Sequence, residues 1–465
     1  LYRMDVSIAV VVFLLTIFGS ISFNGMLRNI AREKNWLIDI PNKSRKFHHR
    51  PTPLTGGIAI QLSMILGFLS LLFLADVKLE KEVFDLFSNN AETVDRTVYK
   101  KSLRLEESDQ QTVFDLLVFE NENDVSSDYE VRLDGIDNSI QIKKIDEATF
   151  RVTNGNEVSN YVIRDGEVIL LDEENNIDNS SNSFVFDTSN SFEVNNFILF
   201  FILFGLALQI FTVLDDARGI PAKYRILFHV VINFLFIMVT GVYVDEVGIT
   251  FNNEVIRLGA WGIPFTIFCV TGIINAFNMI DGLNGLCAAM ISTALVGFII
   301  LTGLDVINYA FIITLGALFG FLMYNLGALG VKRRVFLGDN GSSFLGFFIA
   351  WSCIYLSSSE NNFFNPVNAL WLVFIPLCDC IYVIFDRLSR KQKIFSAERN
   401  HLHHLLIEKG LSASMVLTLM TFLSISMMAL GLYAEHFLNS NLSLYLFIFL
   451  GLSYFLLNRL LLKND

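Results

Sequence analysis

Cysteine is scarce in this chain, and the few cysteines do not suggest a disulfide-stabilised fold. Only five of the 465 residues are cysteines, and all five fall inside or at the edge of apolar runs. A thiol in such surroundings behaves as a small hydrophobic group. Cys378 and Cys380 could form a metal pair, but no further ligands accompany them, so we expect them to pack in the core.

Charged residues are also few, and they are almost missing from long stretches of the chain. Only 17% of the residues are charged, 53% are hydrophobic, and the mean hydropathy is +0.51. Repeated apolar runs have the length of about 20 residues that crosses a bilayer core. We therefore predict an all-α multi-span membrane protein with about eleven transmembrane helices, rather than a soluble protein. The predicted spans are 5–26, 57–75, 196–214, 226–244, 260–278, 283–302, 306–326, 343–358, 366–386, 414–434 and 442–461.

The basic residues predict how the spans are oriented. Segments 27–56, 215–225, 327–342 and 387–413 hold nineteen Lys or Arg, whereas the short loops of the opposite side hold only Arg257. By the positive-inside rule, the first set is cytoplasmic and the N-terminus lies outside. The first apolar run is too long for the core of a signal peptide, so we expect it to be a retained span.

An acidic segment interrupts the apolar pattern. Residues 76–194 contain 28 acidic and 11 basic residues, whereas the rest of the chain contains 18 and 23. Alternating stretches such as YEVRLDG (129–135) and YVIRDGEVILL (161–171), with Asn-Gly and Asp-Gly turn signals, predict a small β-rich lobe. Because it follows the second span, we expect it outside the cytoplasm, with either an unidentified partner or no role beyond an acidic insertion.

Three regions follow from these patterns. We expect spans 1–2 with a basic loop in residues 1–75, the extracytoplasmic insertion in 76–194, and spans 3–11 with catalytic loops in 195–465. The basic residues lie in membrane-adjacent loops without a soluble basic face, so no nucleic-acid partner is predicted.

Five polar clusters are all predicted at cytoplasmic ends of spans. They are RKFHHRPTPLTGG (45–57), LDDARGIPAKYR (214–225), NMIDGLNGL (278–286), FLGDNGSS (336–343) and RNHLHHLL (399–406). Ionisable groups at a membrane are costly and by default mark a functional site. Carboxylates beside Gly-rich loops meet the needs of a Mg²⁺-diphosphate site, in which Mg²⁺ takes one or two carboxylates and substrate phosphate oxygens.

Each cluster alone also has a plainer explanation. Asp215 and Asp216 fit a helix cap or a solvated loop, and the GDNGSS stretch fits a turn with a helix cap. His401 and His404 share a helical face, which suggests zinc, yet no further ligand is near in sequence. Asp379, inside the ninth span, is expected to be paired within the bundle. The five clusters together favour one shared active site.

These motifs, in this order, resemble the polyprenyl-phosphate N-acetylhexosamine-1-phosphate transferases (glycosyltransferase family 4), and within them the WecA-type undecaprenyl-phosphate GlcNAc-1-phosphate transferases. The resemblance also includes the stretch FLMYNLGALGVKRRV (321–335), and it covers nearly the whole chain except residues 76–194. It implies transfer of a HexNAc-1-phosphate, foremost GlcNAc-1-phosphate, from a UDP-sugar to undecaprenyl phosphate with release of UMP. This reaction is the first membrane step of cell-envelope polysaccharide synthesis, and it places the protein in the bacterial inner membrane.

The resemblance carries roles to individual residues. It implies Asp339 as a ligand of Mg²⁺, for which Mn²⁺ can substitute, and we expect Asp281 and Asp216 beside that metal. The expected catalytic residues are Asp215, Asp216, Asp281, Asp339 and His404. The expected substrate-binding residues are Asn278, Asn325, His401, His403, Lys223, Lys46 and Arg50. Lys46, Arg50 and Lys223 are assigned to the lipid phosphate, and His404 or Arg399 to the diphosphate.

Three features depart from the family pattern. Asn284 stands where a second acid is usual, His229 stands where a Gln is common, and the acidic lobe is an addition. The alternatives are a phospho-MurNAc-pentapeptide transferase, whose histidine loop usually has three consecutive His, and, from different classes, a transporter or an inactive scaffold. The expected partners are a UDP-HexNAc, undecaprenyl phosphate and the bilayer; a homodimer is left open.

Overall fold

The chain divides into two compact units. The computed structural model describes residues 4–41, 50–74, 196–251, 254–358, 361–392 and 400–463, together with seven strands between residues 97 and 171. One unit, here called the helical unit, contains Met4–Asp76 and Val194–Asp465. The other, the strand unit, contains Val77–Glu193 and Leu1–Arg3.

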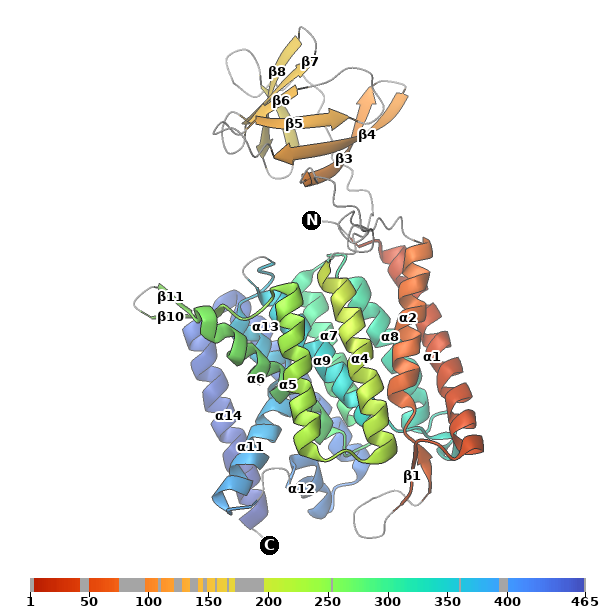
Figure 1. The fold of residues 1–465 in the computed structure, drawn as a ribbon. Helices are drawn as coiled ribbons and strands as arrows, with labels where there is room; N and C mark the ends of the chain where they lie inside the picture. The colour runs from red at the N-terminus through yellow and green to blue at the C-terminus, as the bar shows by residue number, and fades with distance from the viewer. Residues whose placement is uncertain are drawn as a thin grey trace. The chain divides into compact units, whose positions relative to one another are not determined.

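The helical unit has a helix in each range where a span is predicted (Figure 1). The long apolar runs explain this directly, because a helix satisfies every backbone polar group within a bilayer. The helices are α1 (Val6–Lys34), α2 (Gly56–Leu74), α4 (Asn196–Arg218), α5 (Ala222–Thr240), α6 (Gly262–Ile280), α7 (Leu286–Thr302), α8 (Asn308–Asn325), α9 (Gly338–Ser357), α10 (Pro366–Leu372), α11 (Phe374–Ser389), α12 (Leu402–Glu408), α13 (Ala413–Phe437) and α14 (Ser440–Lys463), with short 3₁₀ turns η1 (Gly259–Trp261) and η2 (Val331–Arg333).

Not every one of these helices meets the criteria for a span. Within the described residues, eight are long and apolar enough to cross a membrane, and α10 with α11 makes a ninth only if a pair bent by 83° counts as one span. Helix α7 is shorter, with 17 residues. Helix α9 begins with the polar stretch GDNGSS, which lowers its hydropathy. The protein is therefore a multi-span membrane protein, and the number of eleven stays a prediction.

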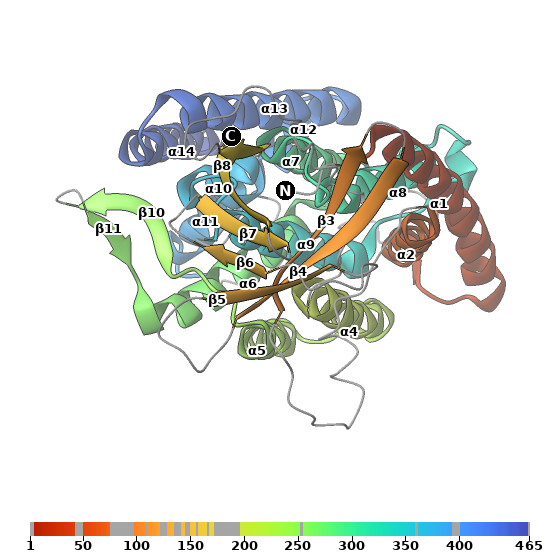
Figure 2. The same ribbon diagram turned by 90° about the horizontal axis from the view of Figure 1, so that it is seen from above.

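Helix α9 lies at the centre of the unit. It packs between α4 and α6 and also contacts α2. Sixteen of its 20 residues are buried. On one side of it α1 packs against α2 and α8, while α13 and α14 lie across the bundle from α4 and α5 (Figure 2). The first turn of α9 can approach α2 closely because Gly57 and Gly341 have no side chains there; a Cβ on Gly341 would lie 2.9 Å from Gly57 Cα.

The strand unit contains one antiparallel sheet whose seven strands pair in sequence order. The strands predicted between residues 129 and 171 are confirmed, for example by the pairing of Phe150 with Tyr161. The two longest strands, β3 and β4, were not predicted individually. The predicted Gly positions of the turns lie outside the described residues, and the extracytoplasmic placement stays a prediction. The strands are β3 (Thr97–Glu107), β4 (Gln110–Glu120), β5 (Asp128–Leu133), β6 (Gln141–Lys144), β7 (Thr149–Asn154), β8 (Glu157–Arg164) and β9 (Glu167–Leu171).

Two short antiparallel strand pairs that were not predicted from the sequence complete the helical unit. Strand β10 (Glu246–Phe251) pairs with β11 (Glu254–Arg257). Strand β1 (Ile38–Asp39) pairs with β2 (Thr52–Pro53) in the connection between α1 and α2. Pro53 then accepts a hydrogen bond from the Phe336 amide at 2.8 Å. This contact brings the first polar cluster to the start of α9.

Candidate active site

Asp216, near the end of α4, caps the start of α9. Its Oδ1 accepts a hydrogen bond from the Asp339 amide at 3.1 Å, and its Oδ2 accepts one from the Asn340 amide at 3.0 Å. The first amides of a helix have no partner within the helix, and a carboxylate there satisfies them and complements the helix dipole. The LDDARG and GDNGSS motifs are therefore joined directly.

Asn340, which was not among the predicted site residues, links three segments. Its Nδ2 donates to Asp216 Oδ2 at 2.6 Å and to the Leu54 carbonyl at 2.9 Å. Its Oδ1 accepts from Gln209 Nε2 at 3.1 Å. The side chain is fully buried, so these bonds fix the α1–α2 connection, α4 and α9 relative to one another.

Arg225, in the first turn of α5, bridges two carboxylates and was also not selected. Its Nη1 lies 2.7 Å from Asp339 Oδ2 and 3.2 Å from Asp215 Oδ2. Asp215 is 4% exposed, and its Oδ1 also accepts from the Ile220 amide at 2.7 Å. A buried carboxylate is costly unless it is paired, so this cation allows Asp215 and Asp339 to lie close together.

Asp281 follows the last residue of α6 and completes the acidic group. Burial and the nearby carboxylates of Asp339 and Asp216 raise the pKa of Asp281 well above its usual value. The same stretch contributes Asn278, whose Nδ2 donates to Ser342 Oγ on α9 at 3.2 Å. The NMIDG and GDNGSS motifs therefore meet, as the sequence predicts.

The histidine loop is held by a buried carboxylate of α11. Asp379 is 1% exposed, and its Oδ2 lies 2.6 Å from His401 Nδ1. Its Oδ1 accepts hydrogen bonds from the Leu402 amide at 3.0 Å and from the Tyr454 hydroxyl of α14 at 2.8 Å. The prediction that Asp379 is paired within the bundle is confirmed, and its partner is a predicted site residue.

His403 and His404 stand beside this pair. The ring centroids of His403 and His404 are 4.1 Å apart. His403 is fully buried, and neither ring nitrogen has a hydrogen-bond partner within the part of the chain that the structure describes. A Cβ at Gly282, in the DGLNG turn, would overlap His403 Nε2. Burial, with a smaller contribution from His404, lowers the pKa of His403 to about 3.

The remaining predicted residues are placed less directly. The Asn325 amide donates to the Val335 carbonyl at 2.9 Å, which shapes the segment before α9. Lys223 is exposed, and its Nζ lies 4.7 Å from the ring centroid of Tyr224. Arg50 is exposed beside β2. The predictions for Lys46 and Arg399 lie outside the described residues.

Two of the three departures from the family pattern are single residues, and they differ in their surroundings. His229 is 4% exposed on α5, one helical turn after Arg225, and its ring nitrogens have no hydrogen-bond partner among the described residues. Asn284 is partly exposed in the turn between α6 and α7.

The acidic group, which consists of Asp215, Asp216, Asp281 and Asp339, offers the carboxylate oxygens that a magnesium ion requires. The described residues do not form a complete set of metal ligands. Within the described residues, no group of three or more His, Cys, Asp or Glu is arranged to hold a metal ion. Asp339 and Asp281 supply the hard oxygen ligands that Mg²⁺ prefers, and substrate phosphates usually provide others. Burial, followed by the carboxylates of Asp339 and Asp216, raises the pKa of Asp281, so a bound cation would stabilise its charged form. The residues therefore fit Mg²⁺, and Mg²⁺ stays a prediction.

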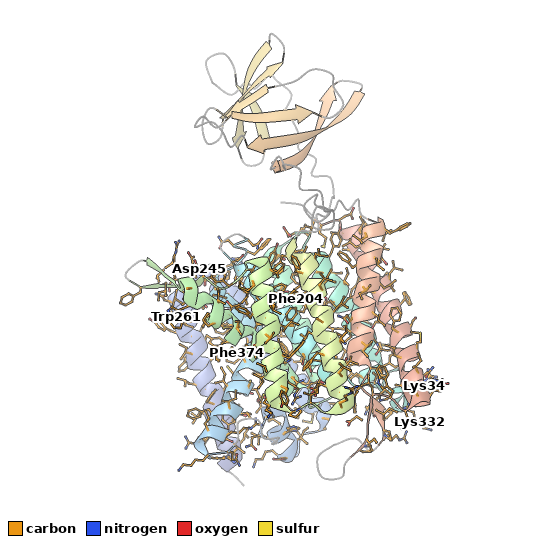
Figure 3. The ribbon with its side chains drawn as sticks, viewed as in Figure 1. Lys34, Phe204, Asp245, Trp261, Lys332 and Phe374 are labelled. Atoms are coloured by element: carbon orange, nitrogen blue, oxygen red, sulfur yellow. The ribbon has the colours of Figure 1, made fainter. Side chains whose placement is uncertain are left out.

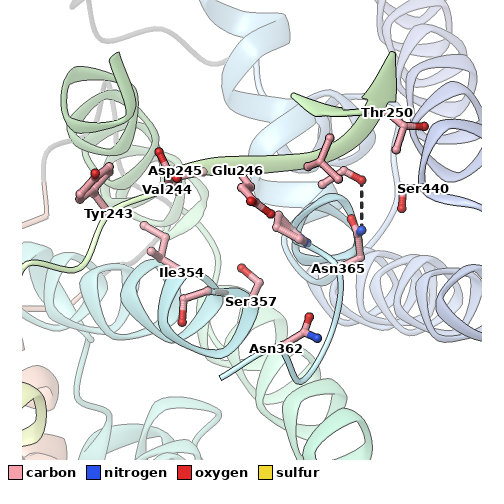
Figure 4. A pocket seen from close by; sticks show the side chains of 14 residues that line it. Tyr243, Val244, Asp245, Glu246, Thr250, Ile354, Ser357, Asn362, Asn365 and Ser440 are labelled. Carbon is pink, nitrogen blue, oxygen red and sulfur yellow. Dashed lines mark hydrogen bonds between the residues drawn. The ribbon is translucent and has the colours of Figure 1, made fainter. Parts of the chain in front are cut away.

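A separate pocket of about 220 Å³ lies beside the β10–β11 hairpin (Figure 4). Its polar groups are largely paired within the protein. Arg257 Nε lies 2.9 Å from Glu246 Oε1, and Asn365 Nδ2 donates to the Gly248 carbonyl at 3.0 Å. We assign this pocket no part in the site.

Several residues that build the site give only a weak signal in the sequence. Arg225 belongs to the motif LDDARGIPAKYR, and Asn340 belongs to FLGDNGSS. Their signal in the sequence is a charged or amide side chain close to the predicted acidic residues. Tyr454 lies far from every motif, in an apolar helix. No pattern in the sequence predicts its contact with Asp379.

The fold and the site define a multi-span membrane protein whose carboxylates and histidines from five chain segments meet at one end of a helix bundle. The chain belongs to glycosyl transferase family 4, whose family model matches residues 198–357. It is 32% identical over 249 residues to an undecaprenyl-phosphate alpha-N-acetylglucosaminyl 1-phosphate transferase of Escherichia coli O157:H7, which covers 52% of this chain and 67% of that protein.

Relatives from other bacteria carry the same name. The protein of Escherichia coli K12 is 32% identical over 243 residues, covering 50% of this chain and 65% of the relative. The protein of Haemophilus influenzae is 32% identical over 244 residues, covering 51% of this chain and 67% of the relative. The match thus spans about two thirds of the length of these relatives.

Proposed function

We infer that this protein transfers GlcNAc-1-phosphate from UDP-GlcNAc to undecaprenyl phosphate and releases UMP. The observation that carries this inference is the meeting of Asp215, Asp216, Asp281 and Asp339 with the histidine loop at one end of a membrane helix bundle, in a chain whose relatives bear that name. The lipid reaches such a site from the bilayer, and the nucleotide reaches it from water.

The chemistry is a direct displacement at phosphorus. An oxygen of the lipid phosphate attacks the phosphorus that bears the sugar, the bond from that phosphorus to the bridging oxygen breaks, and UMP leaves. A phosphate monoester has a second pKa near about 6, so the acceptor is mostly ionised at neutral pH. Positioning and charge neutralisation therefore matter more than a general base or a phospho-aspartyl intermediate.

The acidic group would hold Mg²⁺ through Asp339 and Asp281. When bound, this ion supplies positive charge that stabilises the diphosphate and the departing UMP. Asp216 fixes the first turn of α9 and so the position of Asp339. Arg225 keeps the Asp339 and Asp215 carboxylates in place.

The other polar residues would bind the substrates. His401, oriented by Asp379, and the neighbouring His403 and His404 face the diphosphate and sugar. Asn278 and Asn325 shape the nucleotide side. Lys46, Arg50 and Lys223 hold the lipid phosphate as charge-assisted hydrogen-bond donors.

The placement in the cell follows from the same reaction. The site faces the cytoplasm of a bacterial inner membrane, because UDP-sugars are cytoplasmic and the site-end loops are rich in Lys and Arg. The insertion 76–194 then lies outside the cytoplasm. The product enters cell-envelope polysaccharide synthesis.

An assay with three different UDP-sugar donors tests this proposal. Purified protein in detergent is incubated with undecaprenyl phosphate, MgCl₂ and one of UDP-GlcNAc, UDP-GalNAc or UDP-MurNAc-pentapeptide, and UMP and the lipid-linked product are measured. We expect UMP and lipid-diphosphate-GlcNAc in equal amounts, and no reaction when EDTA replaces MgCl₂. Reaction with UDP-MurNAc-pentapeptide alone would support the peptidoglycan enzyme, and no UMP from any donor would support a transporter or scaffold.

A further inference from the structure

A basic surface lies where α1 ends and α8 connects to α9. It consists of six cations from two segments that are far apart in the sequence: Arg28, Arg32, Lys34, Lys332, Arg333 and Arg334. Glu33 is the one acid within Arg28–Lys34 and Lys332–Arg334. None of these residues has a role in the proposed reaction.

The two segments are joined by a direct contact. Arg32 Nη2 donates to the Lys332 carbonyl at 2.8 Å. Figure 3 shows Lys34 and Lys332 beside each other at the same corner of the helical unit. Arg28 lies within electrostatic range of both Arg32 and Arg333. The fold therefore holds like charges together, which is unfavourable unless something compensates them.

No carboxylate compensates them within the described chain. Across the described residues, no ion pair involves any of the six. Arg28 Nε and Arg334 Nε are buried and lack a hydrogen-bond partner among the described residues. The segment that follows α1, residues 35–49, contains one acid, Asp39, and five basic or histidine residues. Arg32, Lys34, Lys332 and Arg333 are exposed, so their charges are open to an anion from outside the chain.

The apolar residues around the basic surface place it at a membrane boundary. Helix α1 exposes Leu14 and Phe18 along its outer face, at 48% and 66%. Where that face ends, Trp36 is 41% exposed, and Val331, next to Lys332, is 61% exposed. Exposed tryptophans are typical of the headgroup level of a bilayer. The cations thus lie where lipid phosphates lie.

We propose that the basic surface is a binding site for the phosphate of an anionic glycerophospholipid in the leaflet on the active-site side. Guanidinium groups bind phosphate through paired, charge-assisted hydrogen bonds, and basic clusters next to a transmembrane helix attract anionic lipids. A purely topological role for these bases would need neither the close approach of two distant segments nor partially buried arginines. The proposal goes beyond the sugar-phosphate transfer and does not depend on it.

Native mass spectrometry of the full chain in detergent tests the proposal. Wild type is compared with Arg32→Gln/Arg333→Gln, and with the charge-matched control Lys391→Gln/Arg459→Gln, whose two exposed cations lie outside the basic surface. The lipids added are phosphatidylglycerol, zwitterionic phosphatidylethanolamine, polyprenyl phosphate and, separately, inorganic phosphate. Thermal melting of each variant checks folding.

We expect wild type and the control to retain phosphatidylglycerol in preference to phosphatidylethanolamine, and the surface variant to retain it about tenfold more weakly with an unchanged melting temperature. Equal phosphatidylglycerol retention by all three proteins would overturn the proposal, as would equal losses in both variants. If the surface variant loses polyprenyl phosphate rather than phosphatidylglycerol, the surface belongs to the acceptor lipid and the proposal is wrong. Wild-type binding of inorganic phosphate without lipid selectivity would also contradict it.

If the surface variant melts lower, Arg333→Gln alone, which leaves the Arg32–Lys332 contact intact, is expected to weaken phosphatidylglycerol retention, and no change would again overturn the proposal.

Discussion

The Arg225 guanidinium lies 2.7 Å from Asp339 and 3.2 Å from Asp215, so one cation of α5 holds carboxylates from α4 and α9. This relationship explains how several acids share one end of the bundle. It also makes the position of Asp339 dependent on a residue outside the acidic set.

Replacement of Arg225 tests that dependence. We expect Arg225→Lys to lower kcat about 10- to 100-fold, because a compact ammonium on a different stem does not place a donor where the rigid guanidinium holds Nη1 between the two carboxylates. UMP release at saturating substrates measures the effect. Arg257→Gln is the control, since its pair with Glu246 is largely exposed and worth less than about 1 kcal/mol. Equal activity of wild type and Arg225→Lys would contradict the assigned bridge.

The Asp379–His401 contact predicts a loss of activity from changes outside the family motifs. Asp379→Asn should reduce kcat about 10- to 100-fold, because the carboxylate orients the imidazole. Tyr454→Phe should have a smaller effect in the same direction, since it removes one of three contacts to Asp379. Tyr445→Phe, 65% exposed on the same helix, should leave kcat unchanged. If Tyr445→Phe and Tyr454→Phe behave alike, the network has no role in positioning.

The close approach of Gly282 and His403 predicts that a methyl group is harmful there. Because His403 is fully buried against this glycine, Gly282→Ala should displace the ring at a cost of about 1–3 kcal/mol and lower kcat. Gly272→Ala is a matched control on α6, where a new Cβ would meet no atom within 4 Å. Steady-state kinetics and thermal melting should separate the two variants, and similar kcat values would refute the packing argument.

Burial of His403 predicts a pH-dependent stability. Its pKa is lowered to about 3 in the folded protein, so below the ordinary value of about 6.5 the unfolded chain binds a proton that the folded chain does not. Stability should therefore fall as pH decreases from about 6.5 toward 3, by at most about 1.4 kcal/mol per pH unit. Melting temperatures between pH 7 and 5 measure this slope.

The corresponding variants isolate the contribution of this histidine. His403→Gln should flatten the slope, whereas His436→Gln, exposed near the end of α13, should leave it unchanged. Parallel pH profiles for wild type and His403→Gln would show that another group is responsible.

The sequence predicted which segments meet, but not how they are held. Motif order and the distribution of Lys and Arg put Asp216, Asp281, Asp339 and the histidine loop at one end, and the bonds from Asp216 to α9 agree with this. Apolar run length predicted the helix ranges because bilayer thickness fixes that length. Run length carries no information about which helix faces which, so the contact of Tyr454 with Asp379 could not be predicted.

Local breaks in regular structure were also beyond the sequence analysis. The 83° bend between α10 and α11 occurs within an apolar run that was predicted as one span, and Pro376 in the first turn of α11 is the signal that could have marked the break. The β10–β11 hairpin is too short for a clear alternating pattern. Strands β5 to β9 were easier, since turn residues separate them.

The most direct test of the account concerns Asp339 at the start of α9. UMP release from UDP-GlcNAc with undecaprenyl phosphate is measured for wild type and Asp339→Asn over a range of MgCl₂ concentrations, with melting temperatures recorded in parallel. The account predicts Mg²⁺-dependent turnover by wild type and a loss of at least about 100-fold in the variant, without a matching loss of folded protein. Turnover by Asp339→Asn close to that of wild type would contradict it.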